Sequence, residues 1–274
     1  MKVKKAILPV AGLGTRVMPL TLHQPKGMIG IVDKPMVHYV IDEVVNAGIK
    51  HIILVHGPNQ LEFKKYAEHL EKSDDWKKLG VKFDFVEQKE MRGNGDAVYV
   101  AEHLLSNEPV LVCFSDDLLV DKKPPMKTLV DLYEKTGSPV IVLEPVPKKE
   151  VHRYGVVMAK KSKLARDLYE ISDVVEKPKA EEAPSNLTII GRYVVTPELM
   201  NYIGKLYPYK GKEIGLADAL KNYSNDGKKL YGWHFKGRRF DAGSKIGILK
   251  AQAYFGLHHK DLGPEFKKYL KGLK

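Results

Sequence analysis

The chain has 274 residues, of which 43% are hydrophobic, and its 45 Lys and Arg against 34 Asp and Glu give a formal net charge of +11. No apolar run approaches the roughly 18 residues of a membrane-spanning helix, and the apolar part of the N-terminal segment is too short for a secretory signal. A single cysteine, Cys113, excludes an intramolecular disulfide and a cysteine-built metal site, so we expect a protein of the reducing cytoplasm.

Apolar, β-branched segments in the first half of the chain predict strands at residues 5–10, 51–55, 81–87, 110–114 and 138–144. Between the first two strands a helix is predicted, with an apolar face formed by Met36, Val37, Val40, Ile41, Val44 and Val45. Gly48 is expected to end this helix, and a second amphipathic helix is predicted at 95–105. Such alternation indicates a parallel sheet covered by helices on both faces. A ligand is then expected beyond the carboxyl ends of the strands.

The pattern changes after residue 145. Further strands are predicted there without regular intervening helices, in the segments YGVVMA, ISDVVEK, TIIGRYVV and LYGWHF. They indicate a mixed or partly antiparallel extension of the sheet. Residues 244–256 and the segment after them predict C-terminal helices. Because neither a repeat nor a low-complexity linker interrupts the chain, we expect one continuous domain with two lobes and a seam near residue 120.

The first predicted strand runs into the loop AGLGTRVMPLTLHQPKGM, residues 11–28. Gly12 and Gly14 suggest a dinucleotide-binding fingerprint, but Val17 stands where that motif has its third glycine, and the P-loop sequence is absent. The glycines allow close approach of the backbone to a ligand, and Arg16 and Lys26 suit phosphate oxygens. A glycine turn that carries two solvated cations would show the same pattern.

This loop resembles the signature G-x-G-T-R-x-x-P-x-T-x-x-x-P-K of the sugar-1-phosphate nucleotidyltransferase family, and the resemblance extends over residues 4 to about 258. The matching positions are Gly12, Gly14, Thr15, Arg16, Pro19, Thr21, Pro25 and Lys26. Later segments, such as YGVV and FDAGSKIGILKA, are most similar to the UTP–glucose-1-phosphate uridylyltransferase branch of bacteria and archaea. The resemblance implies an α/β, three-layer Rossmann-like fold of the nucleotide-diphospho-sugar transferase type, with a mixed, mostly parallel sheet. Within one domain we then expect a nucleotide-binding lobe (1–120), a sugar-phosphate-binding lobe (121–241) and C-terminal helices (242–274).

The implied reaction is the attack of a sugar-1-phosphate oxygen on the α-phosphorus of a nucleoside triphosphate, with release of pyrophosphate. With UTP and glucose-1-phosphate the product is UDP-glucose. Because two anions must meet, positioning and charge neutralisation should dominate catalysis, and an ionised phosphate oxygen needs no general base. By the family pattern the catalytic cations are Arg16, Lys26 and Lys177.

Two aspartates match the metal-binding positions of the family. Asp116 follows the strand at 110–114, Asp241 lies in RRFDAGSK, and together they would hold Mg²⁺. Asp117 is expected beside the metal site or facing solvent. Without the resemblance, the Asp116–Asp117 pair would more often be a turn that caps a helix, and Asp241 an ordinary turn residue.

The resemblance also divides the substrate contacts into two groups. The nucleotide is assigned to Ala11, Gly12, Gly14, Thr15, Gln88 and Gly93. A glutamine amide can donate and accept at once, which suits a pyrimidine edge, although a polar residue at a strand end would look the same. The sugar phosphate is assigned to Gly155, Glu176, Lys177 and Asn186, with Arg192 as a further matching position. Glu176 and Lys177 are neighbours on a strand, so both can reach one ligand only if Pro178 ends the strand locally.

One departure from the uridylyltransferase branch leaves the nucleotide open. Gly27 stands where that branch usually has a glutamate after Pro-Lys, and the missing carboxylate belongs to the nucleotide side. A thymidylyltransferase that uses dTTP is therefore the alternative to a UTP enzyme. A non-catalytic sugar-nucleotide-binding protein is the alternative of a different class, which the joint presence of Asp116, Asp241, Lys26 and Lys177 disfavours.

The net positive charge suits nucleic acid, an acidic surface or a phosphorylated small molecule as a partner. Alternatively, the surface lysines only keep the protein soluble. A nucleic-acid-binding protein should gather basic and aromatic residues on one element, whereas here Arg16, Lys26 and Lys177 lie in separate motifs. We therefore expect small-molecule substrates, with neither nucleic acid nor membrane as a partner. Related enzymes are often dimers or tetramers assembled through C-terminal helices, so a homo-oligomer is expected.

Overall fold

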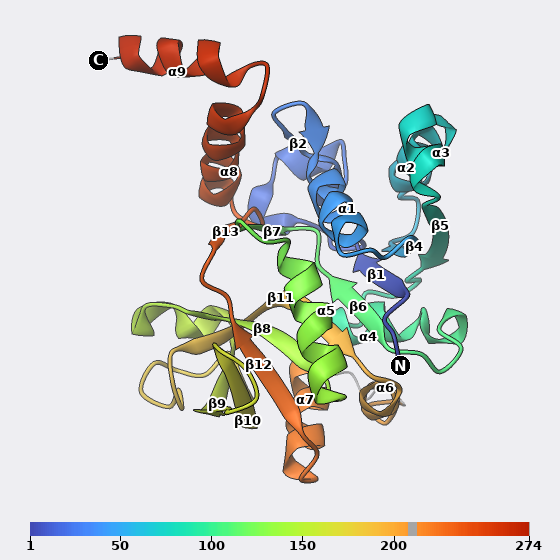
Figure 1. The fold of residues 1–274 in the computed structure, drawn as a ribbon, viewed down its shortest axis with the longest axis vertical. Helices are drawn as coiled ribbons and strands as arrows, with labels where there is room; N and C mark the ends of the chain where they lie inside the picture. Colours follow the sequence, from blue (N-terminus) through green and yellow to red (C-terminus); the bar gives the residue numbers. More distant parts are fainter. Residues whose placement is uncertain (208–212, 274) are drawn as a thin grey trace.

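The computed structural model describes residues 1–207 and 213–273, which form a three-layer α/β arrangement around a nine-stranded sheet (Figure 1). Four strands from the first half run parallel, in the spatial order β5 (Lys82–Glu87), β4 (His51–His56), β1 (Lys5–Pro9) and β6 (Val110–Cys113). In β1, Ala6 and Leu8 pack into the core on one face and Ile7 into the core on the other. The predicted parallel sheet is confirmed for this half.

The second half extends the same sheet with mixed pairing. β11 (Leu187–Val195) runs antiparallel to β6 and to β8 (Val140–Pro145), and β12 (Leu230–His234) is parallel to β8. β10 (Leu168–Glu176) is antiparallel to β12 and to β9 (Gly155–Lys161) at the edge. The mixed extension is therefore confirmed, and residues from both halves of the chain meet at β6 and β11.

Helices cover both faces of this sheet. One face packs against α1 (Met36–Asn46), α2 (Glu62–Lys72) and α5 (Pro125–Thr136), and α3 (Asp74–Leu79) follows α2. The other face packs against α4 (Asn94–Tyr99), α6 (Pro197–Gly204) and α7 (Leu216–Asn225). In α1 the predicted apolar face is buried, except that Val45 is half-buried. α8 (Lys245–His258) packs against two of the short strands described below, β2 and β13. α9 (Gly263–Gly272) follows α8 in the chain (Figure 1).

Two expectations about helices are wrong. The helix predicted at 95–105 ends at Tyr99, and the chain continues into a 3₁₀ turn at Glu102–Leu104. The strands after residue 145 do have regular helices between them, because α6 and α7 separate β11 from β12. Both helices carry ordinary signals: Thr196 caps α6 through a hydrogen bond from Leu199 N, and α7 buries residues at helical spacing.

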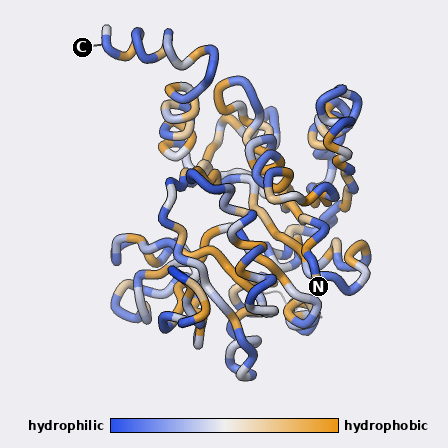
Figure 2. Tube along the Cα trace, in the orientation of Figure 1, coloured by the Kyte–Doolittle hydropathy of each residue, from blue (hydrophilic) through white to orange (hydrophobic). Residues whose placement is uncertain are grey.

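Two short antiparallel pairs lie beside the main sheet. β2 (Gly30–Ile31) pairs with β3 (Lys34–Pro35), and β7 (Asp117–Val120) pairs with β13 (Arg238–Asp241). Figure 2 shows hydrophobic residues along the central strands and hydrophilic ones around them. Among the described residues no helix combines the length and the apolar character needed to cross a membrane.

Candidate active site

A cavity of about 390 Å³ opens beyond the carboxyl ends of β1 and β6, where the sequence predicts the ligand. Its wall comes from the loop after β1, from the segment between β5 and α4, and from the start of β9 and the end of β10. The predicted site residues that line it are Ala11, Gly12, Arg16, Lys26, Gln88, Gly93, Asp116, Gly155, Glu176, Lys177 and Asp241. Both predicted groups of substrate residues therefore face one space.

Three predicted site residues do not line the cavity. Gly14 has φ +63°, and a Cβ there would lie 3.0 Å from Lys26 Cβ, so this glycine lets the loop fold tightly over the lysine. Thr15 is exposed and begins a 3₁₀ turn. Asn186 is exposed, and its backbone oxygen accepts a hydrogen bond from Val146 N at 3.0 Å. Gly14, Thr15 and Asn186 therefore shape loops around the cavity.

Asp116 and Asp241 lie on either side of a narrow gap. A Cβ on Gly243 would lie 2.7 Å from Asp116 Oδ2, 2.9 Å from Asp241 Oδ1 and 2.7 Å from Arg16 Nη2. Ala242 N donates to the Asp116 carbonyl at 2.8 Å, which ties the residue after β13 to the loop between β6 and β7. The bare backbone of Gly243 therefore leaves open the space that the two carboxylates share with Arg16.

Each of the two carboxylates faces a cation. Lys26 Nζ lies 2.5 Å from Asp116 Oδ2, and Arg16 Nη2 lies 3.8 Å from the same oxygen. Arg153 Nη2 lies 3.1 Å from Asp241 Oδ2. Burial alone would raise the pKa of Asp116, but Lys26 and Arg16 outweigh it and hold that pKa below its ordinary value. Asp116 is therefore a carboxylate at neutral pH.

The donor set at this gap fits a divalent cation that is completed by its substrates. Two carboxylates, Asp116 and Asp241, face a common space, and Mg²⁺ is usually held by one or two carboxylates together with water and phosphate oxygens. Within residues 1–207 and 213–273, no cluster of three or more His, Cys, Asp or Glu side chains could hold a metal ion by itself. The gap therefore suits an ion that binds together with a phosphate ester.

The predicted sugar-phosphate residues meet where β10 ends. Glu176 is the last residue of β10 and pairs with Gly155, while Lys177 has left the strand with φ +46°. Lys177 Nζ lies 3.1 Å from Glu176 Oε1, so both side chains reach the same side, as the prediction from Pro178 requires. A Cβ on Gly155 would lie 3.1 Å from Glu176 Oε2, so glycine keeps the floor of the cavity free there.

On the nucleotide side, Gln88 lies behind the turn that carries Gly93. Gln88 Nε2 donates to the Gly93 carbonyl at 3.1 Å and to Asp96 Oδ2 at 2.6 Å. The expectation that this amide both donates and accepts toward a ligand is wrong, because its two hydrogens are used inside the protein. Gly93 has φ +127°, and a Cβ there would lie 2.5 Å from the Ile214 carbonyl, so a larger residue cannot be placed in this turn without movement.

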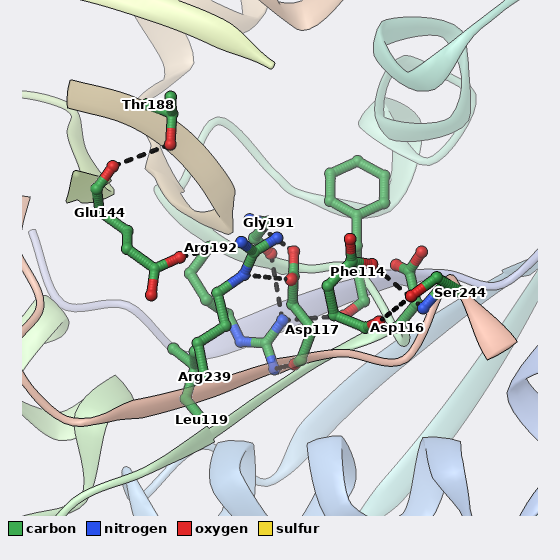
Figure 3. A network of polar contacts seen from close by, with 12 residues as sticks. Phe114, Asp116, Asp117, Leu119, Glu144, Thr188, Gly191, Arg192, Arg239 and Ser244 are labelled. Carbon is green, nitrogen blue, oxygen red and sulfur yellow. Dashed lines mark hydrogen bonds and ion pairs between the residues drawn. The ribbon is translucent and has the colours of Figure 1, made fainter. Parts of the chain in front are cut away.

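Asp117 is expected from the sequence either beside the metal site or facing solvent. In the structure it is buried and paired with Arg239. Arg239 Nε lies 2.6 Å from Asp117 Oδ1, and its Nη1 lies 2.9 Å from Glu144 Oε2. Asp117 Oδ2 also accepts a hydrogen bond from Gly191 N at 3.0 Å. Figure 3 shows Arg239 and Arg192 converging on Asp117, directly beside Asp116. Asp117 thus anchors the strand that follows the first metal-binding candidate.

Arg192, a further family position in the sequence analysis, is fully buried and does not line the cavity. Its Nη2 lies 3.0 Å from Glu43 Oε2, and its Nη1 donates to the Phe114 carbonyl at 2.8 Å. Glu43 in turn accepts a hydrogen bond from Leu119 N at 3.1 Å. Arg192 therefore stabilises the loop between β6 and β7 from the protein interior and not from the cavity.

Sequence reasoning missed Arg153, Asp96 and Arg239. Arg153 and Arg239 line the cavity, and each stands next to a motif that the sequence singled out, YGVV and FDAG. The position of each arginine next to such a motif is the sequence feature that could have identified it. Gly27, whose missing carboxylate left the nucleotide open, does not line the cavity; a Cβ there would lie 3.0 Å from the buried Phe63 ring. A side chain at position 27 would thus point at Phe63.

Comparisons with known proteins identify the family of this chain. The model of the nucleotidyl transferase family matches residues 5–256. The UTP–glucose-1-phosphate uridylyltransferase of Staphylococcus epidermidis is 39% identical over 287 residues, covering 99% of each chain. A crystal structure of UDP-glucose pyrophosphorylase complexed with UDP-glucose is similar with a TM-score of 0.84 and 36% identity, over 92% of this chain and 98% of the other. The UTP-bound UGPase from Acinetobacter baumannii gives a TM-score of 0.85 and 33% identity, over 99% and 100%. The chain therefore belongs to the nucleotidyl transferase family.

Proposed function

We propose that the protein joins UTP and glucose-1-phosphate into UDP-glucose, with release of pyrophosphate. One observation carries the proposal: the gap between Asp116 and Asp241 lies in the same cavity as Gln88 and Gly93 on one side and Glu176 and Lys177 on the other. A nucleotide and a sugar phosphate bound at these two sides would bring their phosphates together at the gap. The relatives named above as uridylyltransferase and UDP-glucose pyrophosphorylase support UTP and glucose as the substrates.

The residues of the cavity suit in-line displacement between two anions. Lys177 would neutralise the attacking sugar phosphate, while Arg16 and Lys26 would face the triphosphate, so that repulsion between the anions falls. Glu176 would accept hydrogen bonds from sugar hydroxyls. Asp116 and Asp241 would hold Mg²⁺, which when bound supplies positive charge to the phosphate oxygens. Since the attacking oxygen is already ionised, the site needs no general base.

The decisive experiment is a panel assay of pyrophosphate release. UTP, dTTP, CTP, ATP and GTP are each combined with glucose-1-phosphate, galactose-1-phosphate and N-acetylglucosamine-1-phosphate, with Mg²⁺ and with excess chelator. We expect the highest kcat/KM for UTP with glucose-1-phosphate and no turnover under chelation. Preference for dTTP would make the protein a thymidylyltransferase, and binding of UDP-glucose without any turnover would make it a non-catalytic binding protein.

Lys177→Ala is expected to raise the KM for glucose-1-phosphate by about ten- to a hundredfold, because one charge-assisted contact to the sugar phosphate is lost. The KM for UTP should stay close to the wild-type value. Initial rates measured with each substrate varied in turn give both constants. Lys179→Ala is the matched control, since Lys179 is 72% exposed and pairs with Glu182. A change confined to the UTP constant would mean that the two sides of the cavity are assigned the wrong way round.

We also propose that the enzyme acts in the cytoplasm as a homo-oligomer, a dimer or a tetramer. Ile246 and Leu249 on α8 are 58% and 63% exposed, and Tyr269 on α9 is 61% exposed. Large apolar side chains exposed on these C-terminal helices favour contact with another subunit. Sedimentation velocity at micromolar concentration tests this proposal, and a single monomeric species would contradict it.

A further inference from the structure

The carboxylate of Asp96 lies directly behind Gln88, on the nucleotide side of the cavity. The two residues are 1% and 2% exposed, respectively. Asp96 Oδ2 and the Gly93 carbonyl oxygen both accept hydrogen bonds from Gln88 Nε2, at 2.6 and 3.1 Å. The Gln88 amide has two hydrogens to donate, and these two acceptors use both of them.

This pair of acceptors fixes which way round the Gln88 amide lies. A carboxylate and a carbonyl can only accept hydrogen bonds, so the group that faces both of them is the NH₂ and not the oxygen. The amide oxygen therefore points away from Asp96 and from the Gly93 carbonyl. Because Gln88 lines the cavity, it offers a ligand an acceptor and no donor.

Asp96 is itself held from its other oxygen. The Tyr207 hydroxyl donates a hydrogen bond to Asp96 Oδ1, and Arg92 Nε lies 3.8 Å from the same oxygen. A buried carboxylate held by such partners has little freedom to turn, because any other arrangement would leave a charge without partners. The orientation of the Gln88 amide is therefore built into the folded protein.

We infer that Asp96 is a positioning residue that makes the site select a pyrimidine with a hydrogen on ring N3. Uracil and thymine carry N3–H, which can donate to the Gln88 oxygen, whereas N3 of cytosine is itself an acceptor and would meet that oxygen with repulsion. A site built around one hydrogen bond rejects a ligand that leaves its group unpaired. The inference rests on the proposed function in placing the base at Gln88, and it deepens it by assigning the rejection of CTP to the residue behind.

The test compares dissociation constants for UTP and CTP, measured by isothermal titration calorimetry. In Asp96→Asn the new amide oxygen should keep the donors Tyr207 and Arg92, so its NH₂ faces the NH₂ of Gln88. Only the Gly93 carbonyl then still favours the wild-type orientation of the Gln88 amide, so Gln88 no longer has a single fixed orientation. We expect the CTP-to-UTP ratio of dissociation constants to fall by about tenfold or more, the effect of one misaligned buried hydrogen bond. Tyr207→Phe is the matched control: it removes a partner of Asp96 but keeps the Asp96–Gln88 bond, so its ratio should stay close to wild type.

Damage to the fold alone would weaken the binding of both nucleotides to a similar extent. The ratio of the two dissociation constants therefore reports the orientation of the Gln88 amide. An Asp96→Asn protein with the wild-type melting temperature and an unchanged ratio overturns the inference, as does a wild-type protein that binds the two nucleotides equally. If Asp96→Asn does not fold, Gln88→Met decides: it should lose the preference for UTP, and retention of the wild-type ratio overturns the inference.

Turnover is measured separately. Preferential binding of UTP without pyrophosphate release contradicts the proposed function alone, and release with unchanged ratios contradicts the inference alone.

Discussion

Asp116→Asn is expected to lower kcat by about 1,000-fold while the melting temperature stays near that of the wild type. The asparagine amide has nearly the shape of the carboxylate but no charge, so it binds a divalent cation poorly. It also no longer holds Lys26, which lies 2.5 Å from Asp116 Oδ2, or Arg16, at 3.8 Å. Pyrophosphate release under saturating substrates measures the loss. Electron paramagnetic resonance of Mn²⁺ with UTP present reports the loss of the cation independently of turnover.

Asp121→Asn is the matched control for this substitution. Asp121 is an exposed aspartate a few residues further along, and it lies outside the lining of the cavity. The control removes one negative charge from the same part of the surface and should keep both kcat and Mn²⁺ binding. Wild-type turnover in Asp116→Asn would contradict the proposed role of this residue in metal binding and leave its pairing with Lys26 as a structural contact.

Arg192→Met is expected to lower the free energy of unfolding by about 3–5 kcal/mol, since it leaves the buried Glu43 without its cation. Arg192 is fully buried, and its guanidinium lies 3.0 Å from Glu43 Oε2. Burial already raises the pKa of Glu43, and Arg192 offsets this effect only in part. Urea denaturation followed by circular dichroism measures the change, which should far exceed that of Arg166→Met, because the Arg166 side chain is 91% exposed.

The pH dependence of this deficit has a definite sign. An acid whose pKa is higher in the folded than in the unfolded state binds more protons when folded, so stability falls as the pH rises above its ordinary pKa. Without Arg192 the pKa of Glu43 should rise further. The deficit of Arg192→Met should therefore be small near pH 4.5, the ordinary pKa of a glutamate, and grow toward neutrality. The double variant Arg192→Met, Glu43→Gln should recover part of the stability, because no charge then remains unpaired. A deficit that does not change with pH would mean that lost packing, and not Glu43, causes it.

The parts of the fold that the sequence predicts correctly are those with a strong local signal. β1, β4 and β6 are short apolar runs between turns, and α1 buries a face at helical spacing. The segments of α6 and α7 lie between strongly apolar runs, and these runs favour strands throughout residues 145–240. Their own signals were present: Thr196 before Pro197 is an N-cap followed by a proline in the first turn.

The site divides in the same way. Arg16, Lys26, Asp116 and Lys177 stand in motifs with fixed spacing, and all four line the cavity, whereas their roles stay predictions. Contacts between distant segments leave no such trace. The pairs Arg192–Glu43 and Arg239–Asp117 each join residues more than a hundred positions apart, and either partner alone resembles an ordinary surface charge. The orientation of Gln88 likewise depends on Asp96, which nothing in the local sequence marks as its acceptor.

The pairing of β7 with β13 has a consequence for biosynthesis. The strand that begins beside Asp116 finds its partner only in residues 238–241, close to the end of the chain. A ribosome-bound chain that has not yet extruded this late segment can form the early parallel strands but lacks Asp241. The two carboxylates proposed to hold a metal ion can therefore face each other only after β13 has been synthesised and has paired with β7.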